Sequence, residues 1–246
     1  MNKNTIRNHW NLISQEYQKQ YLVPTDIVQY AIYGPTEEDL NLLGNVNGKC
    51  IIELGCGGGQ SSIVFAKRGA HCTGVDISIE QLNYAKELAR NNNVEINFIE
   101  GDIEDLNIIE DNSFDIAFSI YAFDYIQNLN KAFSETYRIL RKPGIFVFTV
   151  QHPFYNLLKD IRKPLKIKHN YFERKEVCNE TSGITIEYFN PTIGDLINGL
   201  INTGFNIQKV LEPKPIKNRI NTILEGFPLE VVEQIPSSII IKSIRQ

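Results

Sequence analysis

The stretch Ile51-Ile52-Glu53-Leu54-Gly55-Cys56-Gly57-Gly58-Gly59-Gln60 decides the fold of this chain. A short apolar run is followed by a glycine-rich turn, and a helical pattern begins near Ser61. Glycines lack a Cβ, so the backbone of such a turn can approach a ligand closely, and the helix after it offers free N–H groups. The stretch therefore predicts a strand, a ligand-binding turn and a helix.

Two features of this turn argue against a dinucleotide. The dinucleotide fingerprint has glycine at its first, third and sixth positions, and the sixth position counted from Gly55 is Gln60. Glu53 comes just before the first glycine, and its carboxylate would repel a diphosphate while it suits a cation. A nicotinamide-dependent reductase is therefore a disfavoured alternative.

Strand-like and helix-like segments alternate outward from this turn. The segments expected to be strands are 50–54, 71–76, 94–100, 114–119, 145–150, 205–211 and 239–244. The segments expected to be helices are 5–20, 24–33, 36–39, 61–69, 79–92, 131–140 and 192–202. Alternation of this kind predicts a parallel sheet with right-handed crossovers and helices on both faces. Residues 151–190 break the alternation and are expected to be irregular.

Acidic residues follow the second and third expected strands. Asp76 ends the second strand, and an acid at this place can accept hydrogen bonds from both hydroxyls of a ribose. Asp102 follows the third strand, where it can accept from an adenine amino group while Ile103 packs on the ring. Together with Glu53 these residues predict a nucleoside ligand with a positively charged tail and no phosphate.

Four motifs taken together resemble the class I S-adenosylmethionine-dependent methyltransferases. They are Glu53–Gly57, Gly74–Ser78, Gly101–Ile103 and Phe114–Ser119, and the resemblance covers about residues 46–150. It implies an α/β fold with a doubly wound, mostly parallel seven-stranded sheet of order 3-2-1-4-5-7-6, whose last strand is antiparallel. It also implies S-adenosylmethionine as the methyl donor and S-adenosylhomocysteine as the product.

The resemblance further implies the residues that hold the cofactor. Asp76 would bind the ribose, Asp102 would lie near the adenine amine, and Ser119 would lie under the cofactor. The expected cofactor-binding residues are Glu53, Gly55, Cys56, Gly57, Gly59, Asp76, Ile77, Gln81, Asp102, Ile103 and Ser119.

The chain is expected to form a single methyltransferase domain over residues 1–246. We expect a helical lid over residues 1–45, a cofactor-binding core over 46–150, and a substrate cap inserted at 151–190. Residues 191–246 would complete the sheet.

The methyl acceptor is predicted to be a small molecule, with oxygen or nitrogen favoured over sulfur or carbon as the attacking atom. His152 follows the fifth strand, where ligands of open α/β sheets bind, so it is the candidate general base. The candidate substrate-binding residues are Tyr17, Tyr21, Tyr33, Tyr121, Tyr171 and Glu173. For the N-terminal aromatic residues a docking surface is the favoured interpretation, because an aromatic stripe at helical spacing more often packs against the fold, and a lid over the cofactor is the alternative. Asp124 stands alone after the fourth strand, so no metal is predicted.

Charge and hydropathy limit the remaining classes of function and location. The chain has 246 residues and a formal net charge of −4, which disfavours binding to nucleic acid in general. A basic run from Lys159 to Lys175 nevertheless keeps RNA methylation as an alternative, beside a non-catalytic module that only binds S-adenosylmethionine. No apolar run approaches the length of a membrane span and no secretory signal is evident, so a cytoplasmic protein is expected.

Overall fold

A seven-stranded sheet forms the centre of the computed structural model, which describes residues 3–158, 170–179, 183–216 and 229–246. Its strand order is β3-β2-β1-β4-β5-β9-β8. The strands are β1 (Cys50–Leu54), β2 (His71–Asp76), β3 (Ile96–Glu100), β4 (Phe114–Ile120), β5 (Leu140–Gln151), β8 (Phe205–Leu211) and β9 (Ser238–Arg245). Strands β1 to β5 pair in parallel, and β9 runs antiparallel to both β5 and β8. The predicted sheet order and the antiparallel last strand are confirmed.

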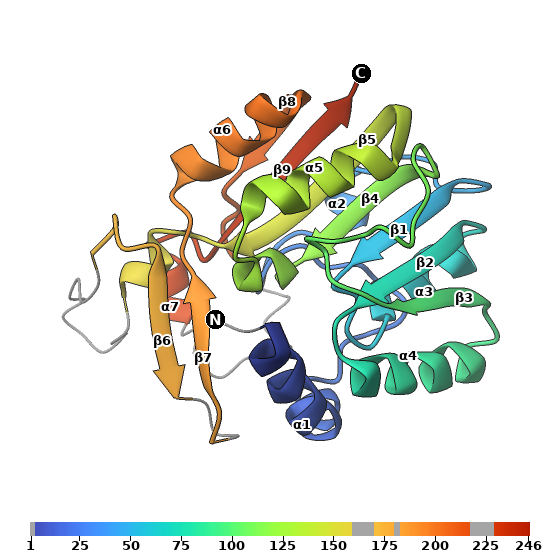
Figure 1. The fold of residues 1–246 in the computed structure, drawn as a ribbon, viewed down its shortest axis with the longest axis horizontal. Coiled ribbons are helices and arrows are strands. Elements are labelled where there is room, and N and C mark those ends of the chain that lie inside the picture. The colour runs from blue at the N-terminus through green and yellow to red at the C-terminus, as the bar shows by residue number, and fades with distance from the viewer. Residues whose placement is uncertain (1–2, 159–169, 180–182, 217–228) are drawn as a thin grey trace.

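Helices cover both faces of this sheet (Figure 1). The longer helices are α1 (Lys3–Tyr21), α3 (Gln60–Lys67), α4 (Ile79–Asn91), α5 (Leu129–Ile139) and α6 (Ile193–Thr203). The shorter ones are α2 (Glu37–Leu40), α7 (Leu229–Val232) and the 3-10 turns η1 (Ala122–Tyr125) and η2 (Tyr155–Leu157).

Alternate residues of one strand serve two separate cores. In β1, Ile52 and Leu54 belong to a core that includes Phe133 of α5 and Leu200 of α6. The residue before Ile52, Ile51, belongs to the opposite core with α3. Because side chains alternate across a strand, one apolar run can bury both faces, as the continuous hydrophobic pattern predicts.

The expected helix over residues 24–33 does not form. The backbone there is irregular, and a bridge between Gln29 and Thr36 holds the segment as a loop. Glu37 explains this conformation, because its buried carboxylate accepts hydrogen bonds from the hydroxyl of Tyr30 and from the N–H groups of Leu42 and Leu43. Tertiary contacts of one buried acid thus replace the local hydrogen bonds of a helix.

The expected irregular segment after residue 150 contains a β-hairpin instead. Strand β6 (Lys175–Asn179) pairs antiparallel with β7 (Thr185–Phe189) in a separate two-stranded sheet. Figure 1 shows this hairpin and α1 at the same side of the central sheet, toward which the arrowheads of β1 and β4 point. The carboxyl ends of the parallel strands therefore face α1 and the hairpin. Residues 159–169 of the expected cap lie outside the described residues.

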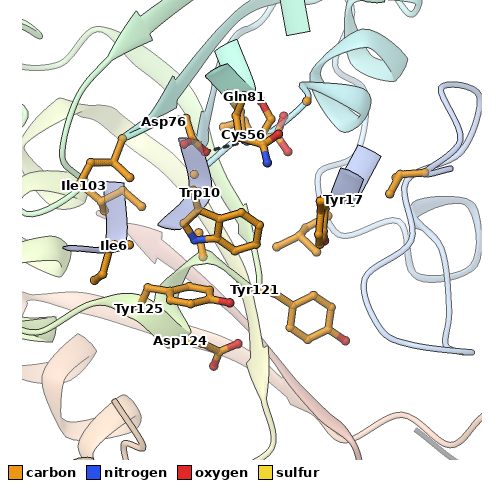
Figure 2. Close-up of a pocket in the computed structure, with 18 of the residues that line it drawn as sticks. Ile6, Trp10, Tyr17, Cys56, Asp76, Gln81, Ile103, Tyr121, Asp124 and Tyr125 are labelled. Carbon is orange, nitrogen blue, oxygen red and sulfur yellow. Dashed lines mark hydrogen bonds between the residues drawn. The ribbon is translucent and has the colours of Figure 1, made fainter. Parts of the chain in front are cut away.

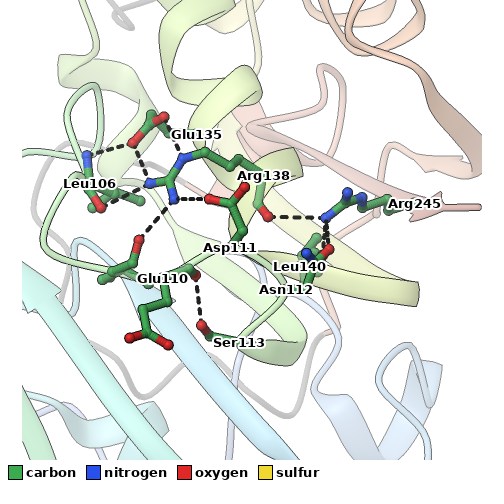
Figure 3. Close-up of polar contacts among 10 residues, drawn as sticks. Leu106, Glu110, Asp111, Asn112, Ser113, Glu135, Arg138, Leu140 and Arg245 are labelled. Carbon is green, nitrogen blue, oxygen red and sulfur yellow. Dashed lines mark hydrogen bonds and ion pairs between the residues drawn. The ribbon is translucent and has the colours of Figure 1, made fainter.

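A polar cluster around Arg138 ties α5 to the loop between β3 and β4 (Figure 3). The Arg138 guanidinium pairs with Glu135 at 2.8 Å and Asp111 at 2.7 Å, and it donates to the carbonyl groups of Leu106 and Ile109. These bonds satisfy loop carbonyls that no strand partner reaches, and so they fix α5 on its face of the sheet.

Candidate active site

One cavity of about 680 Å³ opens at the carboxyl edge of the parallel strands. Its walls come from α1, the turn after β1, the ends of β2, β3 and β4, the turn η1, and β7. Figure 2 shows Asp76 and Cys56 on one side of the cavity and Tyr121, Asp124 and Tyr125 on the other, with Trp10 between them in this view.

The glycine turn is shaped by three left-handed residues. Gly55, Gly57 and Gly59 have φ angles of 74°, 50° and 72°. A Cβ on Gly55 would lie 2.1 Å from the Cβ of Ala122, so η1 can approach the turn only because this residue is glycine. A Cβ on Gly57 would meet only Oε1 of Gln81, at 3.9 Å, so the space in front of Gly57 belongs to the cavity.

Asp76 is fixed by the turn and still free to bind a ligand. Its Oδ2 accepts the N–H of Gly57 and its Oδ1 accepts the N–H of Ser78, both at 2.8 Å. Each carboxylate oxygen can accept about two hydrogen bonds, so one site on each oxygen remains. Because Asp76 lines the cavity, these sites suit a pair of hydroxyl groups such as those of a ribose.

Glu53 is a buried acid behind the turn, and it lines the cavity as well. Its Oε2 accepts hydrogen bonds from the N–H (3.0 Å) and the hydroxyl (2.5 Å) of Ser62. Burial raises the pKa of Glu53 to about 8, and the neighbouring Asp76 carboxylate adds to the effect. A cationic ligand group nearby would favour the ionised form, so this end of the cavity suits a positive charge.

Asp102 and Ile103 lie at the end of β3, and both line the cavity. Asp102 forms an ion pair with Lys3 of α1, whose ammonium group also lies 3.4 Å from Glu104. Farther along α1, Arg7 donates to the carbonyl of Ile77 at 3.3 Å. The N-terminal helix is thus held by polar contacts directly over the ends of β2 and β3.

A chain of amides connects α1 to the glycine turn. Nε2 of Gln18 donates to Oε1 of Gln81 at 2.8 Å, and Nε2 of Gln60 donates to Oε1 of Gln18 at 2.6 Å. All three side chains are buried and line the cavity. The sequence pattern points to Gln81 but not to Gln18, because their contact joins residues 63 positions apart in the chain.

The wall opposite the turn is aromatic and contains one acid that sequence analysis used only to argue against a metal. Trp10 and Tyr17 of α1 pack edge to face at 5.2 Å, and Trp10 meets Tyr125 of η1 at 5.5 Å. Asp124 accepts the N–H of Gln151 and lines the cavity. Its position shortly after the core strand β4 is the sequence feature that could have identified Asp124 as a cavity residue.

Three of the six candidate substrate residues line the cavity, namely Tyr17, Tyr21 and Tyr121. Tyr33 is instead packed in a small core with Tyr155 and Val231. Tyr171 and Glu173 do not line the cavity either, and Glu173 is exposed.

The structure does not bring Ser119 or His152 to the cavity wall. Ser119 is buried and donates to the carbonyl of Leu54 at 2.7 Å, so its hydroxyl joins β4 to β1. His152 is also buried. Its Nδ1 accepts the N–H of Phe154 at 3.1 Å, so Nε2 carries the proton and donates to Glu212 at 2.8 Å. With both ring nitrogens engaged, this geometry suits a structural residue and differs from the expected general base.

Three further observations concern the expected ligands and partners. Among the described residues there is no group of three or more His, Cys, Asp or Glu side chains that could hold a metal ion. In the same part of the chain no helix is long and apolar enough to cross a membrane. Most of the expected basic run, from Lys159 to Lys168, lies outside the described residues.

Comparison with known proteins agrees with this geometry. A family model described as a methyltransferase domain matches residues 52–148. The uncharacterized methyltransferase YbaJ of Bacillus subtilis is 28% identical over 179 residues, which cover 69% of this chain and 70% of that protein. A malonyl-(acyl-carrier protein) O-methyltransferase of Pectobacterium atrosepticum is 34% identical over 112 residues, 46% of this chain and 42% of the relative.

A solved S-adenosylmethionine-dependent methyltransferase from Mesorhizobium loti superposes with a TM-score of 0.70 and 25% identity, covering 84% of this chain and 95% of that one. The family match over residues 52–148 includes the glycine turn and the acidic ends of β2 and β3 that build the cavity. Residues 52–148 therefore form a methyltransferase domain, in a chain with the fold of the class I S-adenosylmethionine-dependent methyltransferases.

Proposed function

We propose that this enzyme transfers a methyl group from S-adenosylmethionine to an oxygen or nitrogen atom of a small molecule. Sulfur and carbon nucleophiles are the alternatives. The observation that carries the proposal is a single cavity that joins the glycine turn and Asp76 on one side to Trp10, Tyr17 and Tyr121 on the other. A donor and an acceptor bound there would share one enclosed space.

The residues of the turn fit the donor. In this proposal Asp76 accepts hydrogen bonds from the ribose hydroxyls, and Asp102 and Ile103 surround the adenine. Gly57 leaves room for the remaining part of S-adenosylmethionine. Ile77 and Gln81 line the same part of the cavity. S-adenosylmethionine supplies an electrophilic methyl group on a sulfonium, so the protein mainly has to align an acceptor in line with that bond.

The N-terminal helix and the hairpin are proposed to close the site. Residues 1–45 would act as the lid, since α1 covers the cofactor side, and residues 151–190 would act as the substrate cap, since Tyr188 and Phe189 of β7 line the cavity. Both contribute aromatic surface, which excludes water from the reacting groups.

The cavity supports a small acceptor rather than a macromolecule. It is bounded on several sides by α1, η1 and β7, and its volume of about 680 Å³ is in the usual range for sites that bind small molecules. The name of the Pectobacterium relative supports oxygen as one acceptor atom.

A measurement of turnover separates this proposal from a module that binds S-adenosylmethionine without catalysis. A cytoplasmic location stays a prediction.

Calorimetry with S-adenosylhomocysteine tests the assignment of the donor site. Asp76→Ala removes the acceptor of two expected hydrogen bonds to a charged group, each worth ~1.5–3 kcal/mol, so affinity should fall at least about tenfold. Asp26→Ala, which removes an exposed carboxylate that does not line the cavity, is the matched control. Unchanged binding by a folded Asp76→Ala variant would defeat the donor assignment.

A further inference from the structure

The acceptor side of the cavity holds a carboxyl group with unused hydrogen-bonding capacity. Both oxygens of Asp124 accept the same N–H group, that of Gln151, at 3.1 and 3.2 Å. A carboxylate can accept about four hydrogen bonds. Since Asp124 lines the cavity, its remaining sites can serve a donor on a ligand.

Asp124 belongs to a segment that contacts the turn proposed to hold the methyl donor. It lies in η1, which starts at Ala122, and the Cβ of Ala122 touches the face of Gly55 where a side chain would stand. Less than one turn of 3-10 helix separates this contact from Asp124. A group bound by Asp124 therefore lies in the same cavity as the proposed donor site, on the wall opposite the turn.

Aromatic rings surround the same space. Trp10 contacts both Tyr17 and Tyr125 edge to face, and the Tyr125 ring lies 5.2 Å from that of Tyr188 on β7. Figure 2 shows Trp10, Tyr121 and Tyr125 around the part of the cavity that Asp124 faces. The negative face of an aromatic ring attracts an ammonium group, most strongly for tryptophan.

The charges of the cavity favour the same kind of ligand. Among its described lining residues Lys3 is the one lysine or arginine, and Asp102 already pairs with it. Asp124 and the exposed Glu16 of α1 are further acids of the lining. An acidic cleft with low-dielectric walls concentrates cations and repels anions.

We propose that the methyl acceptor is an amine, which enters as an ammonium ion and is bound and deprotonated by Asp124. This proposal rests on the methyl transfer proposed above. The ammonium gives one proton to the Asp124 carboxylate. The freed nitrogen lone pair forms the N–CH₃ bond while the S–CH₃ bond breaks, and sulfur keeps that electron pair as the neutral thioether of S-adenosylhomocysteine. The methylated ammonium leaves with its positive charge.

The surroundings of Asp124 make it a suitable base near neutral pH. Burial raises its pKa to about 7. Its titratable neighbours are Tyr121 and Tyr125 on its own segment, and Tyr17 of α1 lines the same cavity. Burial raises the pKa of each of these tyrosines above the usual tyrosine value. Those phenols stay neutral, so Asp124 is the group on this wall that can take a proton.

Binding of three matched probes tests the proposal. Trp10 is the only tryptophan of the chain and lines the cavity, so its fluorescence reports occupancy. The probes are 2-phenylethylamine, 2-phenylethanol and 3-phenylpropanoate, titrated at pH 8 with saturating S-adenosylhomocysteine, whose sulfur carries no charge. We expect the amine to bind at least tenfold more tightly than the alcohol or the acid. Asp124→Asn should remove most of that preference, and Asp26→Asn should keep it.

The controls separate this proposal from the one it rests on. If wild-type protein fails to bind S-adenosylhomocysteine in calorimetry, the proposed function fails. If that binding is intact and the alcohol or the acid binds as well as the amine, or no probe binds, the amine proposal is overturned. A loss of S-adenosylhomocysteine affinity in a folded Asp124→Asn variant would also overturn it, because Asp124 would then belong to the donor site.

Discussion

Gly57 shows how one residue can matter to a ligand more than to the fold. Its φ of 50° lies in the left-handed region, and a side chain there would enter the cavity rather than the core. Gly57→Val should therefore cost only about 1–2 kcal/mol of strain while it abolishes binding of S-adenosylhomocysteine. Calorimetry and thermal unfolding measure the two effects separately.

Gly48 provides the matched control for that prediction. It has a φ of 73°, and a Cβ there would meet nothing within 4 Å. It does not line the cavity, so Gly48→Val carries the same backbone strain without the ligand effect. Equal affinities for S-adenosylhomocysteine in the two variants would show that the turn at Gly57 is only a connector.

His152 leads to a different expectation. Because it is buried and bonded to Phe154 and Glu212, His152→Ala should destabilise the fold by about 1–3 kcal/mol. Methyl transfer per folded molecule should fall less than about tenfold, the scale expected when no base is removed. Urea unfolding and single-turnover rates measure these quantities. A rate loss above about a hundredfold at unchanged stability would instead restore the role of general base.

At the scale of elements, the contact between α1 and the glycine turn is the part of the proposed lid that can be tested most directly. Gln18 accepts one hydrogen bond and donates another there, and each is worth about 0.5–1.5 kcal/mol. Gln18→Ala should loosen α1 and speed dissociation of S-adenosylhomocysteine by roughly five- to a hundredfold. Stopped-flow fluorescence of Trp10 would measure this rate.

Gln15 on the same helix serves as the comparison. It is exposed and does not line the cavity, so Gln15→Ala should leave the dissociation rate unchanged. If both variants release the ligand at the wild-type rate, the amide chain has no part in closing the site, and α1 would be a fixed wall.

At the scale of the whole molecule, the buried acids of the cavity predict an unusual pH dependence of stability. The pKa of Glu53 is raised to about 8 and that of Asp124 to about 7, both above their values in the unfolded chain. The unfolded state therefore loses these protons first as the pH rises. Stability should fall from about pH 4.5 to pH 7 through both groups and on to pH 8 through Glu53, by at most about 1.4 kcal/mol per pH unit for each.

Urea unfolding of the ligand-free protein between pH 5 and pH 8 checks this slope. Glu53→Gln and Asp124→Asn should each flatten the part of the curve that belongs to their group, since an amide does not titrate. Acids with lowered pKa values, such as Asp115 and Glu135, act in the opposite direction, but their effect is confined to lower pH. A slope that neither substitution changes would contradict the assignment.

The alternating strands and helices of the sheet and the residues of the proposed donor side could be predicted from the sequence, because an apolar strand, a glycine turn and an acid at a strand end are patterns of neighbouring residues. The strand order followed from the resemblance of the four motifs to a known family. Glu53, Gly57 and Asp76 could therefore be identified without a structure, and they line the cavity as expected.

The contacts that build the proposed acceptor side and the proposed lid are visible only in the folded chain. Gln18 meets Gln81, Trp10 meets Tyr125, and His152 turns toward Glu212 through contacts between residues at least 60 positions apart. The sequence pattern within a short segment cannot predict contacts between residues so far apart in the chain. The same limit explains residues 24–33, where the buried carboxylate of Glu37 accepts the hydroxyl of Tyr30 and tertiary contacts outweigh helical propensity. Packing decides which polar groups are hydrogen-bonded within the fold and which can still bind a ligand. Both ring nitrogens of His152 are bonded within the protein, whereas Asp124 accepts only one N–H group of the described residues and lines the cavity.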